Sequence, residues 1–171
     1  QYRLGQRPVC RSEATVVVVG NISVGGTGKT PVTLALVEAL QAKGLRTVIV
    51  SRGYGANCVD FPRLVNPSDE AREVGDEPLM LARRAAIPVV IDPVRCRAIA
   101  FANERFGPDV IISDDGLQHY AMGRDYEIVV SDAARGFGNG WLLPLGPLRE
   151  PLGRLNEVNA HVINGDRDKG F

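Results

Sequence analysis

Residues 16–30 combine the residue types that bind phosphate. The segment reads VVVVGNISVGGTGKT and ends in Gly28, Lys29 and Thr30. Four consecutive valines favour a buried strand, and a strand followed by a glycine-rich loop, Gly-Lys-Thr and a helix is typical of a P-loop. Glycines let backbone N–H groups approach phosphate oxygens, the lysine reaches the β- and γ-phosphates, and the threonine hydroxyl ligates Mg²⁺. The pattern predicts nucleotide binding; the alternative is an ordinary turn between a strand and a helix.

One position departs from the usual P-loop pattern. The first glycine of G-x-x-x-x-G-K-[ST] would stand at position 23, where this chain has Ser23. Gly25, Gly26 and Gly28 remain, so we expect the loop to keep its flexibility and its backbone donors.

A second chemical signal is an apolar run that ends in acid, residues 109–115 (DVIISDD). A carboxylate at a strand tip, as in a Walker B element, can hold Mg²⁺ beside Thr30, directly or through water. The pattern is weak alone, but a P-loop about eighty residues upstream strengthens it. The alternative is an aspartate in a strand-terminal turn. His119, one of two histidines, follows closely and is either part of this site or a satisfied turn histidine.

Two other polar positions allow two interpretations each. Arg52 follows an apolar run, so it is either a phosphate ligand or a surface arginine in a tight turn. Asp76 precedes a helical pattern and stands where an N-cap would stand, so it is either a cap or a functional carboxylate.

The segment 137–150 (FGNGWLLPLGPLRE) is unusually apolar for a loop and contains the only tryptophan, Trp141. Core packing is the first explanation. The second is a surface that meets acyl chains or the bilayer interface, where tryptophan is favoured.

The elements that must position these residues alternate between strands and helices. Apolar runs predict strands at 16–19, 46–50, 87–91, 109–115, 126–130 and 160–164. Helical patterns cover 32–42 and 79–86, and another runs from about residue 95 to 106; residues 56–74 read as irregular. We therefore expect an α/β fold with a P-loop NTPase-like, mostly parallel sheet flanked by helices in three layers.

Composition bounds the function. With 171 residues, 44% of them apolar, the chain suits one α/β domain. Twenty basic and twenty acidic residues balance, so no nucleic-acid partner is indicated. Cys10, Cys58 and Cys96 are few and widely spaced, which predicts neither a metal site nor a disulfide framework and fits a reducing cytosol. No apolar run approaches the length of a membrane span, and no signal peptide is visible.

The two ends suggest a part of a longer protein. The chain starts with Gln1 and has Arg3, Arg7 and Arg11 close together, so residues 1–14 form a basic segment ahead of a kinase domain at 15–171, which we expect to be truncated at its C-terminus. The basic segment is either the cytoplasmic flank of a membrane helix or a solvated terminus.

Five blocks in order resemble the tetraacyldisaccharide 4′-kinases of lipid A biosynthesis, over about residues 8–165. They are VGN-(I)-SVGGTGKTP (residues 19–31), SRGYG (51–55), GDEP (75–78), DDGLQH (114–119) and GNGW…GPLRE (138–150). The serine at position 23 is common in that family. The resemblance implies a P-loop kinase, with ATP and Mg²⁺, at the cytoplasmic face of a Gram-negative inner membrane. Its substrate would be an acylated glucosamine disaccharide 1-phosphate lipid, phosphorylated on the 4′-hydroxyl to give lipid IVA; no protein partner can be inferred.

The resemblance also assigns nucleotide and metal ligands. The residues implied to bind ATP are Ser23, Val24, Gly25, Gly26, Thr27, Gly28, Lys29, Thr30, Arg95, Gln118 and Arg149. Thr30 and Asp114 would hold Mg²⁺. Arg95 and Arg149 would meet phosphate charge on nucleotide or lipid, and we expect Arg149 to pair with Glu150.

The implied catalytic residues are Asp76, Lys29, Asp115 and His119. Asp76 matches the carboxylate that draws the proton from the sugar hydroxyl, which makes this its preferred interpretation over a helix cap. A histidine that supports this base in the family has no match in this chain, since His161 lies in a strand-like run.

Two other functions compete with the lipid kinase. A nucleotide-driven switch of the partitioning-ATPase type usually carries a lysine at the second loop position, where this chain has Val24. A soluble small-molecule kinase on the same scaffold would have no need for the apolar loop around Trp141.

Overall fold

The computed structural model describes residues 9–165. They form an α/β fold around a seven-stranded sheet whose strands lie in the order β3-β4-β2-β5-β1-β6-β7. Neighbouring strands are parallel, apart from the antiparallel pair β3 and β4. The strands are β1 (Thr15–Gly20), β2 (Thr47–Ser51), β3 (Arg63–Leu64), β4 (Val89–Ile91), β5 (Val110–Asp114), β6 (Tyr126–Asp132) and β7 (Ala160–Asn164).

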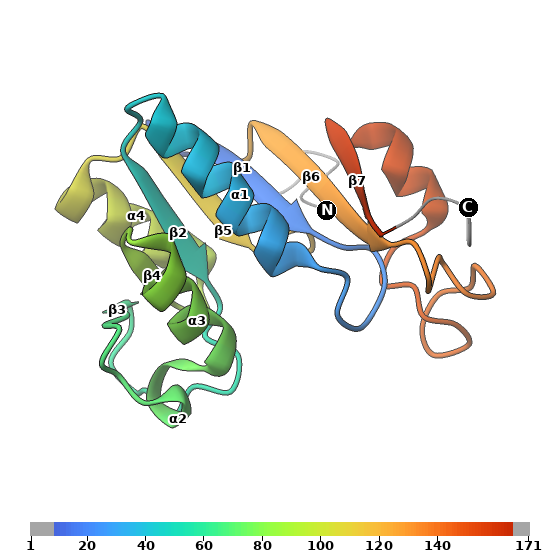
Figure 1. Cartoon of the computed structure of the whole chain (residues 1–171), viewed down its shortest axis with the longest axis horizontal. Helices are drawn as coiled ribbons and strands as arrows, with labels where there is room; N and C mark the ends of the chain where they lie inside the picture. The colour runs from blue at the N-terminus through green and yellow to red at the C-terminus, as the bar shows by residue number, and fades with distance from the viewer. Residues whose placement is uncertain (1–8, 166–171) are drawn as a thin grey trace.

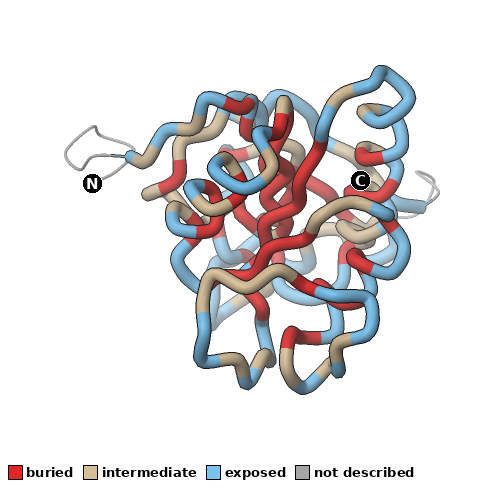
Figure 2. The backbone as a smooth tube through the Cα atoms, turned by 90° about the vertical axis from the view of Figure 1, so that its left-hand side faces the viewer, coloured by how far each residue is buried: buried red, intermediate tan, exposed pale blue. Residues whose placement is uncertain are grey.

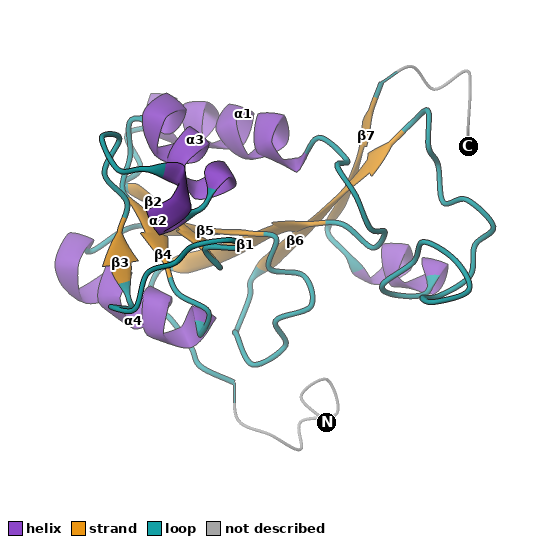
Figure 3. Cartoon of the chain, turned by 90° about the horizontal axis from the view of Figure 1, so that it is seen from below, coloured by secondary structure: helices purple, strands orange, loops and turns teal. Residues whose placement is uncertain are grey.

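Helices cover both faces of the sheet. They are α1 (Lys29–Ala42), α2 (Ala71–Val74), α3 (Asp76–Ala85), α4 (Arg95–Phe106) and the 3₁₀ helix η1 (Leu152–Glu157). Helices α1 and α3 lie on one face and α4 on the other (Figures 1 and 3), which is the predicted three-layer arrangement. The 3₁₀ helix lies on the α4 side near β6 and β7 (Figure 3).

The alternation of valines along β1 supplies both layers of the core. Val16 and Val18 belong to the apolar cluster that includes α4, whereas Val17 and Val19 belong to the cluster of α1 and α3. All four are buried, as is most of the central sheet (Figure 2). Because helices cover both faces, such a strand needs apolar residues at every position, and each buried valine contributes roughly 2 kcal/mol.

The order of the strands places three chemical segments at one edge of the sheet. β1 lies between β5 and β6, and β5 lies between β1 and β2. The carboxyl ends of β1, β2 and β5 therefore meet, and they lead into the glycine-rich loop, the loop after Ser51 and the turn after Asp114. Ligands of open α/β sheets bind at this edge.

The predicted strands and longer helices are confirmed within a few residues at their ends, but the prediction that 56–74 is irregular is partly wrong. That stretch contains β3, which adds two residues to the sheet edge, and the four-residue α2. Elements this short carry no periodicity and are fixed by their neighbours. No helix among residues 9–165 has the length and apolar character that a membrane crossing requires. The first eight residues of the basic N-terminal segment lie outside the described residues.

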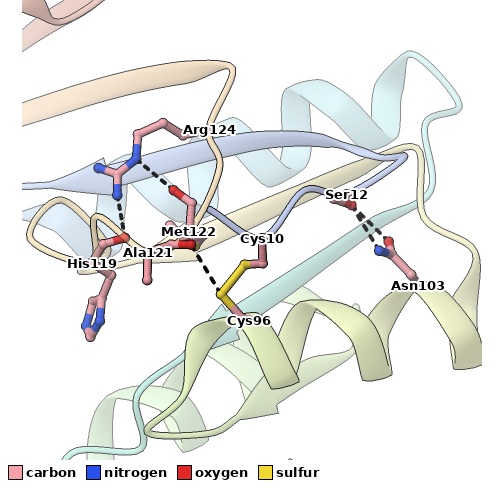
Figure 4. The surroundings of a disulfide bond; sticks show 8 residues. All are labelled: Cys10, Ser12, Cys96, Asn103, His119, Ala121, Met122 and Arg124. Carbon is pink, nitrogen blue, oxygen red and sulfur yellow. Dashed lines mark hydrogen bonds between the residues drawn. A yellow bond between two sulfur atoms is a disulfide. The ribbon is translucent and has the colours of Figure 1, made fainter. Parts of the chain in front are cut away.

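A disulfide between Cys10 and Cys96 contradicts the prediction that the cysteines form no such bond. The Cα atoms of the pair are 5.8 Å apart although the residues are separated by 86 positions. Both cysteines also contact the carbonyl oxygen of Ala121: the Cys10 backbone N–H donates to it at 2.9 Å and the Cys96 sulfur lies 3.4 Å away. Spacing along the chain did not reveal the pair because the fold, and not the sequence interval, brings the segment before β1 against the first turn of α4 (Figure 4).

Candidate active site

A cleft of about 650 Å³ opens where the carboxyl ends of the central strands meet. It gathers residues from segments far apart in the sequence, and most of them were predicted. The predicted residues that line it are Gly25, Gly26, Lys29, Arg52, Asp76, Arg95, Asp115, Gln118, His119 and Arg149. Ser51, Tyr54 and Glu77 complete the lining, so the sequence blocks do converge on one place.

The glycine-rich loop has the left-handed backbone turns that are typical of a P-loop. Gly25 and Gly28 have φ angles of 98° and 83°, in the left-handed region that disfavours side chains. The buried Asn21 side chain supports the loop from below, since its amide donates to the carbonyl oxygen of Gly25 and to the hydroxyl of Thr27, both at 3.2 Å. Asn21 was not predicted as a site residue, although it belongs to the first sequence block, residues 19–31.

The backbone amides of this loop are free to receive an anion. Among the described residues, no acceptor receives a hydrogen bond from the amides of residues 25–29. The helix α1 that follows has no acidic residue in its first turn and no side-chain cap, so its positive end is not neutralised. Unpaired amides at a helix N-terminus fit phosphate oxygens.

Ser23 departs from the usual glycine because its backbone takes part in a bridge. It pairs with Leu148, and the N–H of Val24 donates to the carbonyl of Pro147 at 2.8 Å. The N–H of Arg149 in turn donates to the carbonyl of Ile22 at 2.7 Å. An extended backbone suits serine, and this pairing fixes residues 147–149 against the phosphate loop.

Two cations share one carboxylate at the centre of the cleft. Lys29 Nζ lies 3.4 Å from Asp115 Oδ1, and Arg149 Nη1 lies 3.4 Å from Asp115 Oδ2. Burial by itself raises the pKa of Asp115, but Lys29 and Arg149 reverse this and hold the pKa below its ordinary value. The prediction that Arg149 pairs with Glu150 is wrong: consecutive residues point apart, and Glu150 binds Gln118 and Arg154 instead.

Asp114 is the buried acid of the site. Its side chain is almost fully covered, and burial, with the charges of Glu77 and Asp115, raises its pKa to about 6. One carboxylate oxygen, Oδ1, is buried without a hydrogen-bond partner among the described residues. An orphaned carboxylate oxygen is the donor type that Mg²⁺ prefers, so Asp114 fits the predicted metal role. Thr30, the second predicted ligand, occupies the second position of α1.

Asp76 is the first residue of α3 and its exposed side chain lines the cleft. The N-cap position belongs to Gly75, and no side chain caps this helix, so the cap interpretation of Asp76 is wrong. A side chain at Gly75 would clash with the carbonyl of Tyr54, which explains the glycine at this close approach. Asp76 is thus a carboxylate that local structure does not require.

Arg95 acts from the wall of the cleft. It is buried, and its guanidinium donates to the backbone carbonyls of Asp92 at 3.2 Å and Asp114 at 2.9 Å. Burial lowers its pKa to about 10. It therefore supports the Asp114 strand end, and a direct phosphate contact stays a prediction.

Gln118 and His119 lie on a turn directly after β5. The Gln118 amide donates to the Asn21 carbonyl at 3.1 Å and to Glu150 at 2.7 Å, which ties this turn to the phosphate loop. Burial, together with the positive charges of Arg95 and Arg52, lowers the pKa of His119 to about 4. His119 is accordingly a neutral imidazole at physiological pH.

Three more of the predicted loop residues line a different hollow. Ser23, Val24 and Thr27 line a second hollow of about 370 Å³, which also includes Gly25 and Arg135. Arg135 was not predicted, and it lies so close to the loop that a side chain at Gly25 would stand 2.3 Å from its Nη1. The two hollows thus flank one loop.

The apolar loop beside the cleft is not part of the core. Trp141, Leu143 and Leu145 are 60%, 52% and 71% exposed, so the core-packing interpretation is wrong for them. Leu148, a few residues on, is fully buried. The first part of this segment, around Trp141, is therefore exposed to solvent. Its last part, around Leu148, packs against the phosphate loop.

Known proteins match this chain along its length. Residues 1–170 match the family model Tetraacyldisaccharide-1-P 4′-kinase. A tetraacyldisaccharide 4′-kinase of Aeromonas hydrophila is 52% identical over 164 residues, which cover 96% of this chain and 49% of that relative. One of Pseudomonas syringae pv. tomato is 49% identical over an alignment of 174 residues, covering 100% of this chain and 53% of the relative. A crystal structure of LpxK from Aquifex aeolicus in complex with ATP superposes with a TM-score of 0.87 at 32% identity, over 99% of this chain and 54% of that one. The chain spans about half the length of the curated relatives it matches.

Proposed function

Since the chain belongs to the tetraacyldisaccharide-1-P 4′-kinase family, we propose that it carries the nucleotide site of an ATP-dependent lipid kinase. The reaction transfers the γ-phosphate of ATP to the 4′-hydroxyl of a tetraacyldisaccharide 1-phosphate and yields lipid IVA. Residues 15–171 form the kinase domain and residues 1–14 a basic segment before it.

One observation supports this function most directly: the carboxylate of Asp76 and the unpaired backbone amides of residues 25–29 lie at the same cleft. The free amides of residues 25–29 and Lys29 hold the triphosphate, and Asp76 stands in the same cleft. Phosphoryl transfer asks mainly for positioning and charge neutralisation. Asp76 accepts the proton of the attacking hydroxyl, a role for which an exposed carboxylate with no structural duty is suited.

The other charged residues neutralise phosphate. The carboxylate of Asp115 lies between Lys29 and Arg149, and both cations line the cleft. On nucleotide binding, phosphate oxygens compete for these two cations. Thr30 and Asp114 would hold Mg²⁺, which supplies positive charge to the phosphates when bound.

The acceptor is an acylated lipid because the apolar loop adjoins the phosphate loop. Trp141, Leu143 and Leu145 expose large apolar side chains on the segment that is pinned to Ser23 and Val24 through residues 147–148. Such a loop suits acyl chains or a membrane surface. We place the enzyme at the cytoplasmic face of the inner membrane of a Gram-negative bacterium.

The test is transfer of labelled γ-phosphate by the complete protein in mixed micelles. The acceptors are the tetraacyldisaccharide 1-phosphate and the matched, deacylated disaccharide 1-phosphate. We expect label on the 4′-oxygen of the acylated acceptor and little on the deacylated one. Equal transfer to both would indicate a soluble small-molecule kinase, and ATP hydrolysis that ignores either acceptor would indicate a nucleotide switch.

A further inference from the structure

Arg124 lies outside the cleft but holds the turn that carries two of its residues. It lines a separate hollow of about 480 Å³, together with Tyr120, Glu127 and Arg154. The connection between β5 and β6 covers residues 115–125, and the turn within it at residues 116–123 carries Gln118 and His119 into the cleft. The turn therefore separates this hollow from the cleft and lines both of them.

The guanidinium of Arg124 binds the backbone of the turn at three points. Its Nη1 donates to the carbonyl of Leu117 at 2.8 Å, its Nη2 to the carbonyl of His119 at 2.6 Å and its Nε to the carbonyl of Met122 at 3.3 Å. The contacts to His119 and Met122 are drawn in Figure 4. The Arg124 side chain is only 14% exposed, so water competes little for these carbonyls.

A chain of charged contacts closes this arrangement into a ring. Arg124 Nη1 also donates to Glu127 at 2.9 Å, and Glu127 accepts a hydrogen bond from Arg154. Arg154 Nε lies 3.3 Å from Glu150, whose other oxygen accepts from the Gln118 amide at 2.7 Å. The turn is thus held by its backbone at Arg124 and by its Gln118 side chain at Glu150.

A guanidinium is the side chain that this geometry requires. It has five N–H donors in a rigid plane, which can serve three carbonyls and a carboxylate together. A lysine in the same place carries the same charge but has three donors on one atom, and it cannot span carbonyls that belong to residues five positions apart. The substitution Arg124→Lys therefore keeps the positive charge and removes the planar set of donors.

We propose that Arg124 is a positioning residue that fixes the turn bearing Gln118 and His119 against the cleft, through its three backbone carbonyl contacts. The effect on phosphoryl transfer rests on the proposed function; the effect on the shape of the turn does not. Each is therefore measured separately.

The first experiment is an NMR titration of His119 and His161 in the complete protein, without added nucleotide. The variant is Arg124→Lys. The control is Arg46→Lys, because Arg46 lies outside the cleft lining and forms an ion pair with Asp109 at 2.8 Å. In Arg124→Lys the turn loosens and His119 gains solvent, so its pKa rises from about 4 toward its ordinary value, by about one unit, although the positive charge remains. His161 stays unchanged in both variants, and His119 stays unchanged in the control.

A second variant, Glu127→Gln, keeps the test decisive if Arg124→Lys does not fold. Glu127→Gln leaves the three carbonyl contacts and weakens only the ring, so His119 should shift in the same direction by less. Circular dichroism and urea unfolding verify that each variant is folded. If Arg124→Lys is folded and His119 titrates as in the wild type, the positioning role is overturned; if Arg124→Lys does not fold, an unmoved His119 in Glu127→Gln overturns it.

The second experiment measures lipid phosphorylation by the complete protein. We expect Arg124→Lys to lower kcat by about 10- to 100-fold with the KM for the lipid unchanged, because misplaced groups affect the reacting geometry more than acceptor binding. Unchanged kcat, with a shifted His119, would overturn the role in the reaction and leave the wild-type kinase activity itself established.

Discussion

Residues 147–149 connect two regions of opposite character, the charged cleft and the exposed apolar loop around Trp141. In the cleft, charged side chains are paired with one another: the carboxylate of Asp115 lies 3.4 Å from both Lys29 and Arg149. In the apolar loop, large side chains such as Trp141 and Leu145 are exposed and uncovered by the described residues. The cleft is thus organised in advance for charge, whereas the loop gains only when something apolar covers it.

Under the proposed function, this difference predicts that the chemical step and the binding of the acceptor depend on separate regions. Substitutions in the cleft should change the rate for bound acceptor, and substitutions in the loop should change how much acceptor or membrane is bound. The following predictions test the separation, from the largest expected effect to the smallest.

Asp76→Asn should lower lipid phosphorylation by about 10³-fold, because the amide cannot accept the hydroxyl proton. Nucleotide affinity should stay within about twofold, since the free amides and Lys29 are untouched. Single-turnover phosphorylation and ATP binding by calorimetry measure the two effects. Rapid phosphorylation by the variant would remove Asp76 from the role of base.

Lys29→Met should lower the rate by about 10²-fold, because one of the cations that neutralise the phosphates is lost. Arg149 remains beside Asp115 and retains part of the charge. ATP affinity should fall as well, in contrast to Asp76→Asn. A variant that kept wild-type kinetics for ATP would show that the cleft charges do not contact phosphate.

The double variant Trp141→Ser and Leu145→Ser should lower binding to anionic phospholipid vesicles by about 10-fold, through lost apolar burial. ATP binding should not change, because neither side chain lines the cleft. Vesicle co-sedimentation checks the first point. The matched substitution of Tyr54, which is exposed in the lining of the cleft and lies outside the apolar loop, serves as control; an equal loss there would contradict the comparison between the two regions.

Asp114→Asn should stabilise the metal-free protein by about 1 kcal/mol at pH 8. The pKa of Asp114 is about 6 in the folded chain against 3.8 ordinarily, so the folded state binds this proton more tightly. The wild type therefore loses stability as pH rises from 4 to 6, and the cost is complete above pH 6. Urea unfolding at pH 8 and pH 4.5 should give a difference between variant and wild type that shrinks at the lower pH. A constant difference would mean that Asp114 is not the group responsible.

Sequence patterns predicted the sheet and the cleft but not the contacts that support the cleft. The strand at Val16–Val19 and the residues Lys29, Asp76 and Asp115 were found because periodicity and short motifs are local signals. Asn21, Arg124 and Arg135 escaped because each acts through neighbours that only the fold brings together.

Two interpretations failed for the same physical reason. Adjacent charges such as Arg149 and Glu150 suggest a pair, but residues 149–150 form a bend in which the two side chains reach different partners, Asp115 and Arg154. Cysteine spacing likewise says nothing about the proximity of Cys10 and Cys96, since the whole P-loop and four strands lie between them.

The Cys10–Cys96 bond also bears on the order in which the sheet assembles. Thr15 of β1 pairs with Val110 of β5, 95 positions later (110 minus 15), so this central pairing must close a long loop. Through the disulfide, the same two strands are separated by roughly 20 residues, which lowers the entropic cost of closure by about 1.4 kcal/mol. Since pairing between distant segments limits how fast such sheets form, an oxidised chain should find the β1–β5 register sooner than a reduced one.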